Sequence, residues 1–220
     1  MKHALPVICV FFISCGKTSS EYGSVKGAVY FEDAKYHDKR ADADASVLLL
    51  NLKDSSQSSG TAVDATGHFR IDSVATGDYL LVIVSNNTVG TTTEVFDALD
   101  KTTVEIDRVF HSDLESLASR YRDRINLFKD SAAKSLATGA NPLRAVNLHR
   151  QLSDSADSYA GIVLDSIPAN IRERFAISSA APRKIMCSRL KIFKSHTETI
   201  QYNFGESALK PPEFPTPKIL

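Results

Sequence analysis

The sequence predicts a β + α chain in which a seven-stranded β-sandwich is followed by a helical C-terminal region. Two observations carry this prediction. From residue 24 to about residue 110, apolar side chains come in short runs separated by turn residues, which is typical of strands. After residue 110 the apolar spacing lengthens to three and four residues, which is typical of amphipathic helices. The chain of 220 residues is long enough for one or two compact domains.

The composition is that of a folded protein without a strong electrostatic preference. Hydrophobic residues make up 43% of the chain, which is enough to bury a core. The 26 basic residues are matched by 26 acidic ones, so no overall field favours nucleic acid, and we expect no nucleic-acid partner. At this level an enzyme and a binding module remain equally open.

The first 14 residues have the pattern of a signal peptide. Lys2 and His3 supply a positive start, and residues 4–13 form an apolar run. This run is too short to cross a bilayer as a helix, which needs about 20 residues, but it has the length of a signal peptide's hydrophobic region. We therefore expect residues 1–14 to be removed from an exported chain.

Residues 12–15, Phe-Ile-Ser-Cys, end this run, with the small Ser14 directly before Cys15. They resemble the lipobox of bacterial lipoproteins. The resemblance implies cleavage before Cys15, lipidation of that cysteine with fatty acids such as palmitate, and a membrane partner reached through the lipid. It also implies a location in the cell envelope, at the outer membrane, and leaves the periplasmic and surface faces both open. The alternative is an ordinary secretory signal with an incidental cysteine.

The remaining thiol has no partner for a disulfide. Of the three cysteines, Cys9 leaves with the signal peptide and Cys15 carries the lipid, so Cys187 is left over. We expect Cys187 to be buried as a small hydrophobic residue. A catalytic thiol would need a base and an orienting group, and the sequence indicates neither.

Residues 15–23 form a polar, lipidated tether, and the strands of the sandwich are predicted to follow within residues 24–110. The run at residues 47–52 is almost wholly apolar, which predicts a central strand. At residues 69–71 apolar and polar side chains alternate, as in a strand with one buried face. The predicted strands are residues 25–31, 47–52, 61–63, 69–71, 79–84, 91–96 and 102–109.

A tight turn is predicted between two of these strands. Asp64 and Gly67 bracket it, because aspartate often begins such turns and glycine accepts a positive φ angle. Phe69 then points to the core face of the next strand. Together with Val-Lys-Gly-Ala-Val at residues 25–29 and Ala-Ser-Val at residues 45–47, this stretch resembles the carboxypeptidase regulatory-like domain.

That resemblance implies a transthyretin-like, seven-stranded β-sandwich over about 85 residues. The glycine usual before the second strand of the family is missing, and Ala-Asp-Ala-Asp stands at residues 41–44 instead. The resemblance implies little about function, because such domains are attached to many envelope proteins.

A helical hairpin is predicted within residues 111–180. Ser112 and Glu115 have the spacing of a capping box, Gly139 ends the first helix, and Pro142 begins the second. Each helix carries one apolar stripe, so the two are expected to pack antiparallel across a short joint. The stripes are Leu114, Leu117, Tyr121, Ile125, Phe128 and Ala132 in the first helix, and Ala145, Leu148, Leu152, Ala156, Tyr159, Val163 and Ile167 in the second.

The region 181–220 gives no single prediction, although a short third helix is expected just before it, near residues 171–175. Residues 183–194 mix basic and apolar side chains, and a helix and a strand fit them equally well. This stretch could touch anionic lipid head groups, but a solvated face is favoured. Four prolines from residue 211 onward predict a Pro-rich, disordered tail.

The sequence contains no HExxH, GxSxG or glycine-rich phosphate-loop motif. We therefore predict a protein that is not an enzyme, with no catalytic residues, no cofactor and no metal. Asp38, Asp42 and Asp44 fall in one predicted loop and could ligate calcium, but a solvated acidic loop is favoured. Tyr36 and His37 in the same loop could stack on a sugar, but a plain exposed loop is favoured.

These features predict a non-catalytic, lipid-anchored envelope protein whose β-sandwich binds or presents a protein or glycan partner. The alternative is an accessory subunit of an envelope enzyme or transport complex that docks through its helical region. An enzyme with its site in residues 111–200 is a third reading. An exposed apolar face on the hairpin would favour docking, and a closed pocket with convergent polar groups would favour an enzyme.

Overall fold

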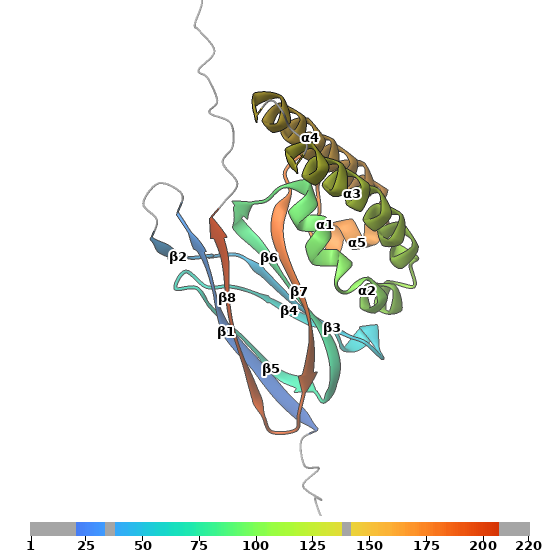
Figure 1. Cartoon of the computed structure of the whole chain (residues 1–220). Coiled ribbons are helices and arrows are strands. Elements are labelled where there is room, and N and C mark those ends of the chain that lie inside the picture. The colour runs from blue at the N-terminus through green and yellow to red at the C-terminus, as the bar shows by residue number, and fades with distance from the viewer. Residues whose placement is uncertain (1–20, 34–37, 138–141, 207–220) are drawn as a thin grey trace, which may run out of the picture.

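The fold is a mixed β and α structure of three layers, two β-sheets and one layer of helices (Figure 1). The computed structural model describes residues 21–33, 38–137 and 142–206. Cys15, Tyr36 and His37 lie outside these described residues, as do residues 1–14 and the Pro-rich tail.

Each sheet has four strands. Sheet A contains β1 (Tyr22–Glu32), β2 (Lys39–Ala41), β5 (His68–Ala75) and β8 (Thr197–Glu206). Sheet B contains β3 (Ser46–Asn51), β4 (Ser59–Ala62), β6 (Gly77–Val89) and β7 (Arg183–Ile192). A 3-10 turn, η1 (Ser55–Gln57), connects β3 to β4. The helices are α1 (Thr92–Asp100), α2 (Thr103–Phe110), α3 (Leu114–Ala137), α4 (Pro142–Ser166) and α5 (Ala169–Arg174).

Strand β1 is the centre of sheet A. It pairs antiparallel with β5 along its first part and with β2 near its end. On its other side it pairs in parallel with β8, the last strand of the described chain. Sheet B has the order β4-β3-β6-β7 with antiparallel pairs throughout, so the strands added by the C-terminal region lie in both sheets.

The apolar strands β3 and β6 separate two hydrophobic cores. Alternate residues such as Leu49 and Leu81 face sheet A and form the sandwich core with Phe69. The residues between them, such as Leu48 and Leu80, face the helices and form the helix core. Because both faces of sheet B are buried, these two strands read as continuous apolar runs rather than as alternating ones.

Residues 91–110 were predicted as two strands, and this prediction is wrong, because they form α1 and α2. Thr91 caps α1: its side chain accepts from the backbone N–H of Glu94, and the Glu94 carboxylate accepts from the backbone N–H of Thr91. Val95 and Phe96 are then buried in the helix core. The cap and the helix core together outweigh the β-propensity of the threonines and valines in this segment.

The strands predicted at residues 25–31, 47–52, 61–63, 69–71 and 79–84 are confirmed as β1, β3, β4, β5 and β6. The strands missing from that prediction are β2, β7 and β8, of which β7 lies in the stretch for which helix and strand fitted equally well. The sandwich therefore consists of residues 22–89 and 183–206, with all the helices between β6 and β7, rather than of residues 24–110. The predicted tether also ends early, because Tyr22 and Gly23 already belong to β1.

The predicted helical hairpin and the short third helix are confirmed as α3, α4 and α5. The predicted capping box at Ser112 is wrong. The first backbone N–H groups of α3, those of Leu114 and Glu115, donate instead to the carboxylate of Asp107 in α2. The Ser112 hydroxyl donates to the same carboxylate, and a charged acceptor is a stronger cap than a hydroxyl.

The helices lie on the outer side of sheet B, and the α3–α4 hairpin extends beyond the sheet (Figure 1). Within the described residues, no helix has an apolar stretch long enough to span a lipid bilayer.

Candidate functional site

The outer face of sheet A carries a shallow groove that we call the outer groove. It has a volume of about 390 Å³ and crosses β1, β5 and β8. Its residues are brought together by strand register, since Ala28 of β1 lies opposite His68 of β5 on one side and Gln201 of β8 on the other. Two residues before Ala28 on β1, Lys26 lies between Arg70 of β5 and Thr199 of β8. The lining residues are Lys26, Gly27, Ala28, Tyr30, His68, Phe69, Arg70, Thr199, Ile200 and Gln201.

A small side chain creates the depression. Ala28 is only 5% exposed, because longer side chains stand around it on all three strands. In a pleated sheet Lys26 and Tyr30 point to the same face as Ala28, two residues away along the strand. A methyl group between longer neighbours therefore forms the floor of the outer groove, and the neighbours form its walls.

Cationic groups dominate one end of the outer groove. Lys26 and Arg70 lie side by side in the register of β1 and β5. Arg70 donates to both carboxylate oxygens of Asp72, at 2.8 and 2.9 Å. This hydrogen bond lowers the pKa of Asp72 and raises the pKa of Arg70, so both stay charged. Both side chains are well exposed, and an incoming anion can compete with Asp72 for the guanidinium.

Tyr30 forms the opposite end. The ammonium of Lys39 lies 4.0 Å from the centre of the Tyr30 ring, in a cation–π contact. The ring edge also packs against the turn, where a Cβ built on Gly67 would come within 3.1 Å of Tyr30 Cε1. The aromatic ring is thus supported from β2 and from the turn that precedes β5.

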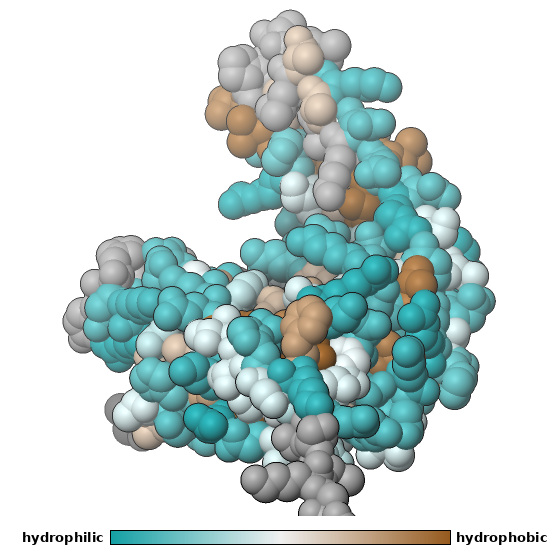
Figure 2. All heavy atoms as spheres, turned by 90° about the horizontal axis from the view of Figure 1, so that it is seen from below, coloured by the Kyte–Doolittle hydropathy of each residue, from teal (hydrophilic) through white to brown (hydrophobic). Residues whose placement is uncertain are grey.

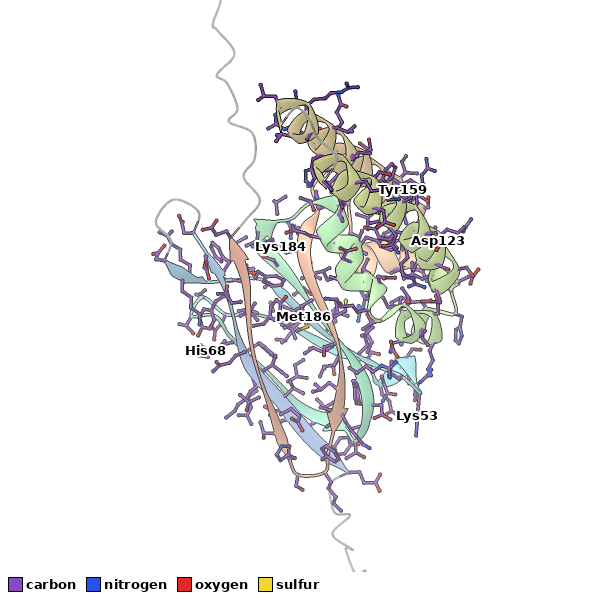
Figure 3. The ribbon with its side chains drawn as sticks, in the orientation of Figure 1. Lys53, His68, Asp123, Tyr159, Lys184 and Met186 are labelled. Atoms are coloured by element: carbon purple, nitrogen blue, oxygen red, sulfur yellow. The ribbon has the colours of Figure 1, made fainter. Side chains whose placement is uncertain are left out.

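The same turn positions His68. Asp64 Oδ1 accepts hydrogen bonds from the backbone N–H groups of Thr66 and His68 and from the Thr66 hydroxyl. The Thr66 hydroxyl lies 3.0 Å from His68 Nδ1, which leaves Nε2 free of this contact. The hydrogen bond from the Thr66 side chain is the main cause of a lowered pKa of Asp64. His68 projects from β5 on the side away from the helices (Figure 3).

The outer groove has side chains that suit the binding of a polar ligand. It offers cationic donors, an imidazole, the Gln201 amide and the Thr199 hydroxyl around an apolar floor. A serine or cysteine nucleophile held by a base is not among its lining residues. Such a surface can hold a polar ligand through several hydrogen bonds.

The three aspartates considered as calcium ligands have different roles in the structure. Asp38 pairs with Arg40 at the surface. Asp42 is fully buried, and its Oδ1 accepts from the backbone N–H groups of Asn86 and Asn87, which ties the loop before β3 to β6. Asp44 adopts a left-handed backbone conformation with φ 62°. Across residues 21–33, 38–137 and 142–206, no three His, Cys, Asp or Glu side chains lie close enough to hold a metal ion.

Cys187 lies on β7, where it is half-buried rather than fully buried and packs against the helix core. Burial raises the pKa of its thiol to about 12, so the thiol stays protonated at neutral pH. A protonated thiol is a poor nucleophile, which agrees with the expected packing role.

A second polar cluster joins three helices. Arg122 of α3 donates to Asp100 of α1 and to Glu115 of α3, each at 2.6 Å, and Thr103 of α2 donates to the same Glu115. The hydrogen bond from Thr103 is the main cause of a lowered pKa of Glu115, whereas burial raises the pKa of Asp100. The donors and acceptors of this cluster satisfy one another, so it serves to hold the helices together.

The basic stretch 183–194 is strand β7, not a helix, together with the turn that follows it. Arg189 pairs with the buried carboxylate of Glu105 in α2, and Arg183 donates to Asn86. Lys184 reaches across to β8 and donates to the carbonyl oxygens of Phe204 and Glu206. These three basic side chains therefore bind parts of the chain itself.

Sequence reasoning did not find the outer groove. Its β1 and β5 residues lie in correctly predicted strands, and a strand at residues 25–31 brings Lys26, Ala28 and Tyr30 to one face. The missing part was β8, because only strand pairing brings Thr199 and Gln201 to that face. The polar and apolar residues that alternate in Thr197–Glu206 were the signal that could have identified this strand.

No protein-family model matches the chain, and no curated protein matches it either. Among solved structures, it is similar to a "putative carbohydrate binding protein", PA1324 from Pseudomonas aeruginosa, with 12% sequence identity and a TM-score of 0.25. The alignment covers 30% of this chain and 66% of that chain, just under two thirds of it. A similarity this low carries no argument about function, which therefore depends on the geometry of the outer groove.

Proposed function

We propose that this chain is a lipid-anchored, non-catalytic protein of the cell envelope whose outer groove binds a glycan. The observation that carries the proposal is the groove itself, a recess of about 390 Å³ with hydrogen-bonding side chains around an apolar floor. Sugars present hydroxyl groups around a weakly apolar ring, and this lining offers partners to both parts. The lipid anchor on Cys15 rests on the lipobox resemblance.

The positive charge at one end of the outer groove favours an acidic glycan. Lys26 and Arg70 are paired in register at one end of the outer groove, and His68 lies two residues before Arg70 on the same strand. A carboxylate on the sugar could accept hydrogen bonds from the Arg70 guanidinium, which binds carboxylates with two donors at once. We therefore propose a glycan that contains uronic acids or comparable acidic sugars.

The test uses a variant that fills the outer groove and leaves both hydrophobic cores unchanged. Ala28→Leu adds a side chain to the floor, where it occupies the space that the ligand needs. The probe is an oligogalacturonate, with a neutral galactose oligomer as the comparison ligand. Calorimetry should detect oligogalacturonate binding to the wild type and at least a tenfold weaker binding to Ala28→Leu, a loss of about 1.4 kcal/mol.

Ala62→Leu is the matched control, because Ala62 is exposed on β4 in the other sheet and the chemical change is the same. It should bind the oligogalacturonate as the wild type does. Equal binding by all three proteins, or a preference for the neutral oligomer, would remove the outer groove or the acidic sugar from the proposal.

The anchor has its own test. Cys15→Ala removes the thiol on which the thioether would form, so the protein should lose palmitate labelling and move from the detergent phase to the aqueous phase. Cys187→Ala is the control and should label as the wild type does, because Cys187 is distant from the cleavage point in the sequence. Unchanged partitioning of Cys15→Ala would mean that the chain is not a lipoprotein of this type.

A second function, docking to an envelope complex, is favoured by the surface of the α3–α4 hairpin. Leu143 is 78% exposed, Val146 is 58% exposed and Leu127 is 56% exposed. A pull-down of the detergent-solubilised protein from its own envelope tests this function. A partner recovered with the wild type and lost with Leu143→Ser plus Val146→Ser would support docking, and its retention would argue against this surface.

A further inference from the structure

Two exposed aromatic side chains lie at the end of the sandwich where the described chain begins. Tyr22 of β1 is 51% exposed, and Phe193, which follows β7, is 52% exposed. The backbone N–H of Ser195 donates to the Tyr22 carbonyl at 2.9 Å, and that of Ser24 donates to the His196 carbonyl at 2.9 Å. These hydrogen bonds hold the start of β1 against the β7–β8 turn, so both residues lie at the same end of the sandwich and their exposed rings are part of its surface.

This surface, which we call the aromatic end, consists of Tyr22, Phe193 and the lysines Lys191 and Lys194. The ammonium of Lys191 lies 5.6 Å from the centre of the Phe193 ring. Figure 2 views the molecule from this end and shows apolar side chains surrounded by polar ones. Aromatic rings beside lysines are typical of surfaces at the level of lipid head groups, where the ring contacts the acyl boundary and the ammonium stays in water.

The aromatic end carries little net charge. Its lysines are offset by Glu21 at the start of the chain, by Asp78, which is in register with Lys191, and by Glu198, which lies 3.5 Å from His196. Attraction to an anionic membrane is therefore weak here. The apolar area of the two rings is the part that water disfavours, and its removal from water would supply the driving force.

The distance to the proposed anchor is short. Seven residue steps separate Cys15 from Tyr22, and a fully extended chain covers at most about 25 Å over that length. The lipid on Cys15 would therefore keep the aromatic end within reach of the head groups, whatever path the linking residues take. A weak interfacial contact suffices under such a tether, because the local concentration of the membrane is high.

We propose that the aromatic end rests on the lipid surface and sets the orientation of the protein, with Tyr22 and Phe193 inserted at the head-group level. This proposal rests on the proposed lipid anchor. The α3–α4 hairpin lies away from the start of β1 (Figure 1), so it would point away from the membrane. The outer groove would stand along the side of the sandwich, open to ligands in the surrounding layer.

The experiment uses a fluorescent reporter in the mature chain. The sequence contains no tryptophan, so Phe193→Trp gives a single emission from the aromatic end. The chain from Cys15 onward, with Cys187→Ala, is coupled through Cys15 to a maleimide lipid in vesicles of equal parts phosphatidylcholine and phosphatidylglycerol. Chemical coupling places the protein on the bilayer whether or not the cell lipidates Cys15, so the result is independent of the anchor test.

On these vesicles the Phe193→Trp emission should shift to shorter wavelength and lose accessibility to aqueous iodide, compared with the uncoupled protein. Leu143→Trp, at the start of α4, is the control and should keep the emission and quenching of a solvent-exposed tryptophan. Adding Tyr22→Ser should reduce the shift of Phe193→Trp. A Phe193→Trp reporter as exposed to iodide as Leu143→Trp would overturn the proposal, even if palmitate labelling establishes the anchor.

Discussion

Gly67 shows how one residue serves both the fold and the candidate site. Its φ angle is 89°, and its N–H donates to the Asp64 carbonyl at 3.0 Å, as the sequence predicted for this turn. A Cβ at Gly67 would lie 3.1 Å from Tyr30 Cε1 and 3.2 Å from the Val29 carbonyl oxygen. The absence of a side chain therefore allows the turn, and it also lets the Tyr30 ring sit at the end of the outer groove.

At the scale of the residue, Gly67→Val should destabilise the protein by about 1–3 kcal/mol, because a β-branched residue at this φ is strained. The control is Ala65→Val, since Ala65 is exposed in the same turn and has a negative φ angle. Thermal unfolding followed by circular dichroism measures both. A melting temperature of Gly67→Val equal to that of Ala65→Val would contradict the role given to this turn.

Helix α1 shows what could and could not be predicted from the sequence at the scale of the element. The spacing of Thr91 and Glu94 is a capping-box signal, and Val95 and Leu99 follow at helical spacing. The β-branched threonines and valine of this segment suggested a strand instead, and burial in the helix core favours the helix. The opposite case is β8, whose residues alternate between polar and apolar in the sequence, but whose place beside β1 follows only from strand pairing. Local patterns identified strands such as β3 and β6 and the long helices α3 and α4, but they did not show which distant elements pack against each segment.

Thr91→Ala should cost about 1 kcal/mol, because it leaves N-terminal N–H groups of α1 without an acceptor. Thr91→Ser keeps the hydroxyl and should stay close to the wild type. Urea unfolding at constant pH gives the free energy of unfolding for both variants. Two equally stable variants would mean that water replaces the cap without loss.

At the scale of the whole molecule, the two cores share sheet B, so the layers depend on one another. Leu48 and Leu80 are buried by the helices, whereas Leu49 and Leu81, next to them in the same strands, are buried by sheet A. The apolar run at residues 47–52 predicted a central strand correctly. That its second face is covered by helices was not predicted, because α1 and α2 were predicted as strands and the later helices were assigned to a separate region after residue 110.

A fragment of residues 16–110 should therefore fail to fold cooperatively. It lacks β8, the parallel partner of β1, and β7, the partner of β6, and it leaves the helix core open. The fragment should bind a hydrophobic dye and unfold without a sharp transition, whereas the chain of residues 16–206 should melt cooperatively. Calorimetry compares the two, and a cooperative transition for the shorter fragment would mean that β7 and β8 are dispensable.

The pairing of the first strand with the last has a consequence for the order of events in the cell. Ser24 and Thr197 are hydrogen-bonded across 173 positions of sequence, so sheet A cannot close before the end of the chain is available. A contact of such long range forms late in folding. If the chain is exported as we propose, this late closure would keep the polypeptide unfolded during transit, and sheet A would form only after β8 has crossed the membrane.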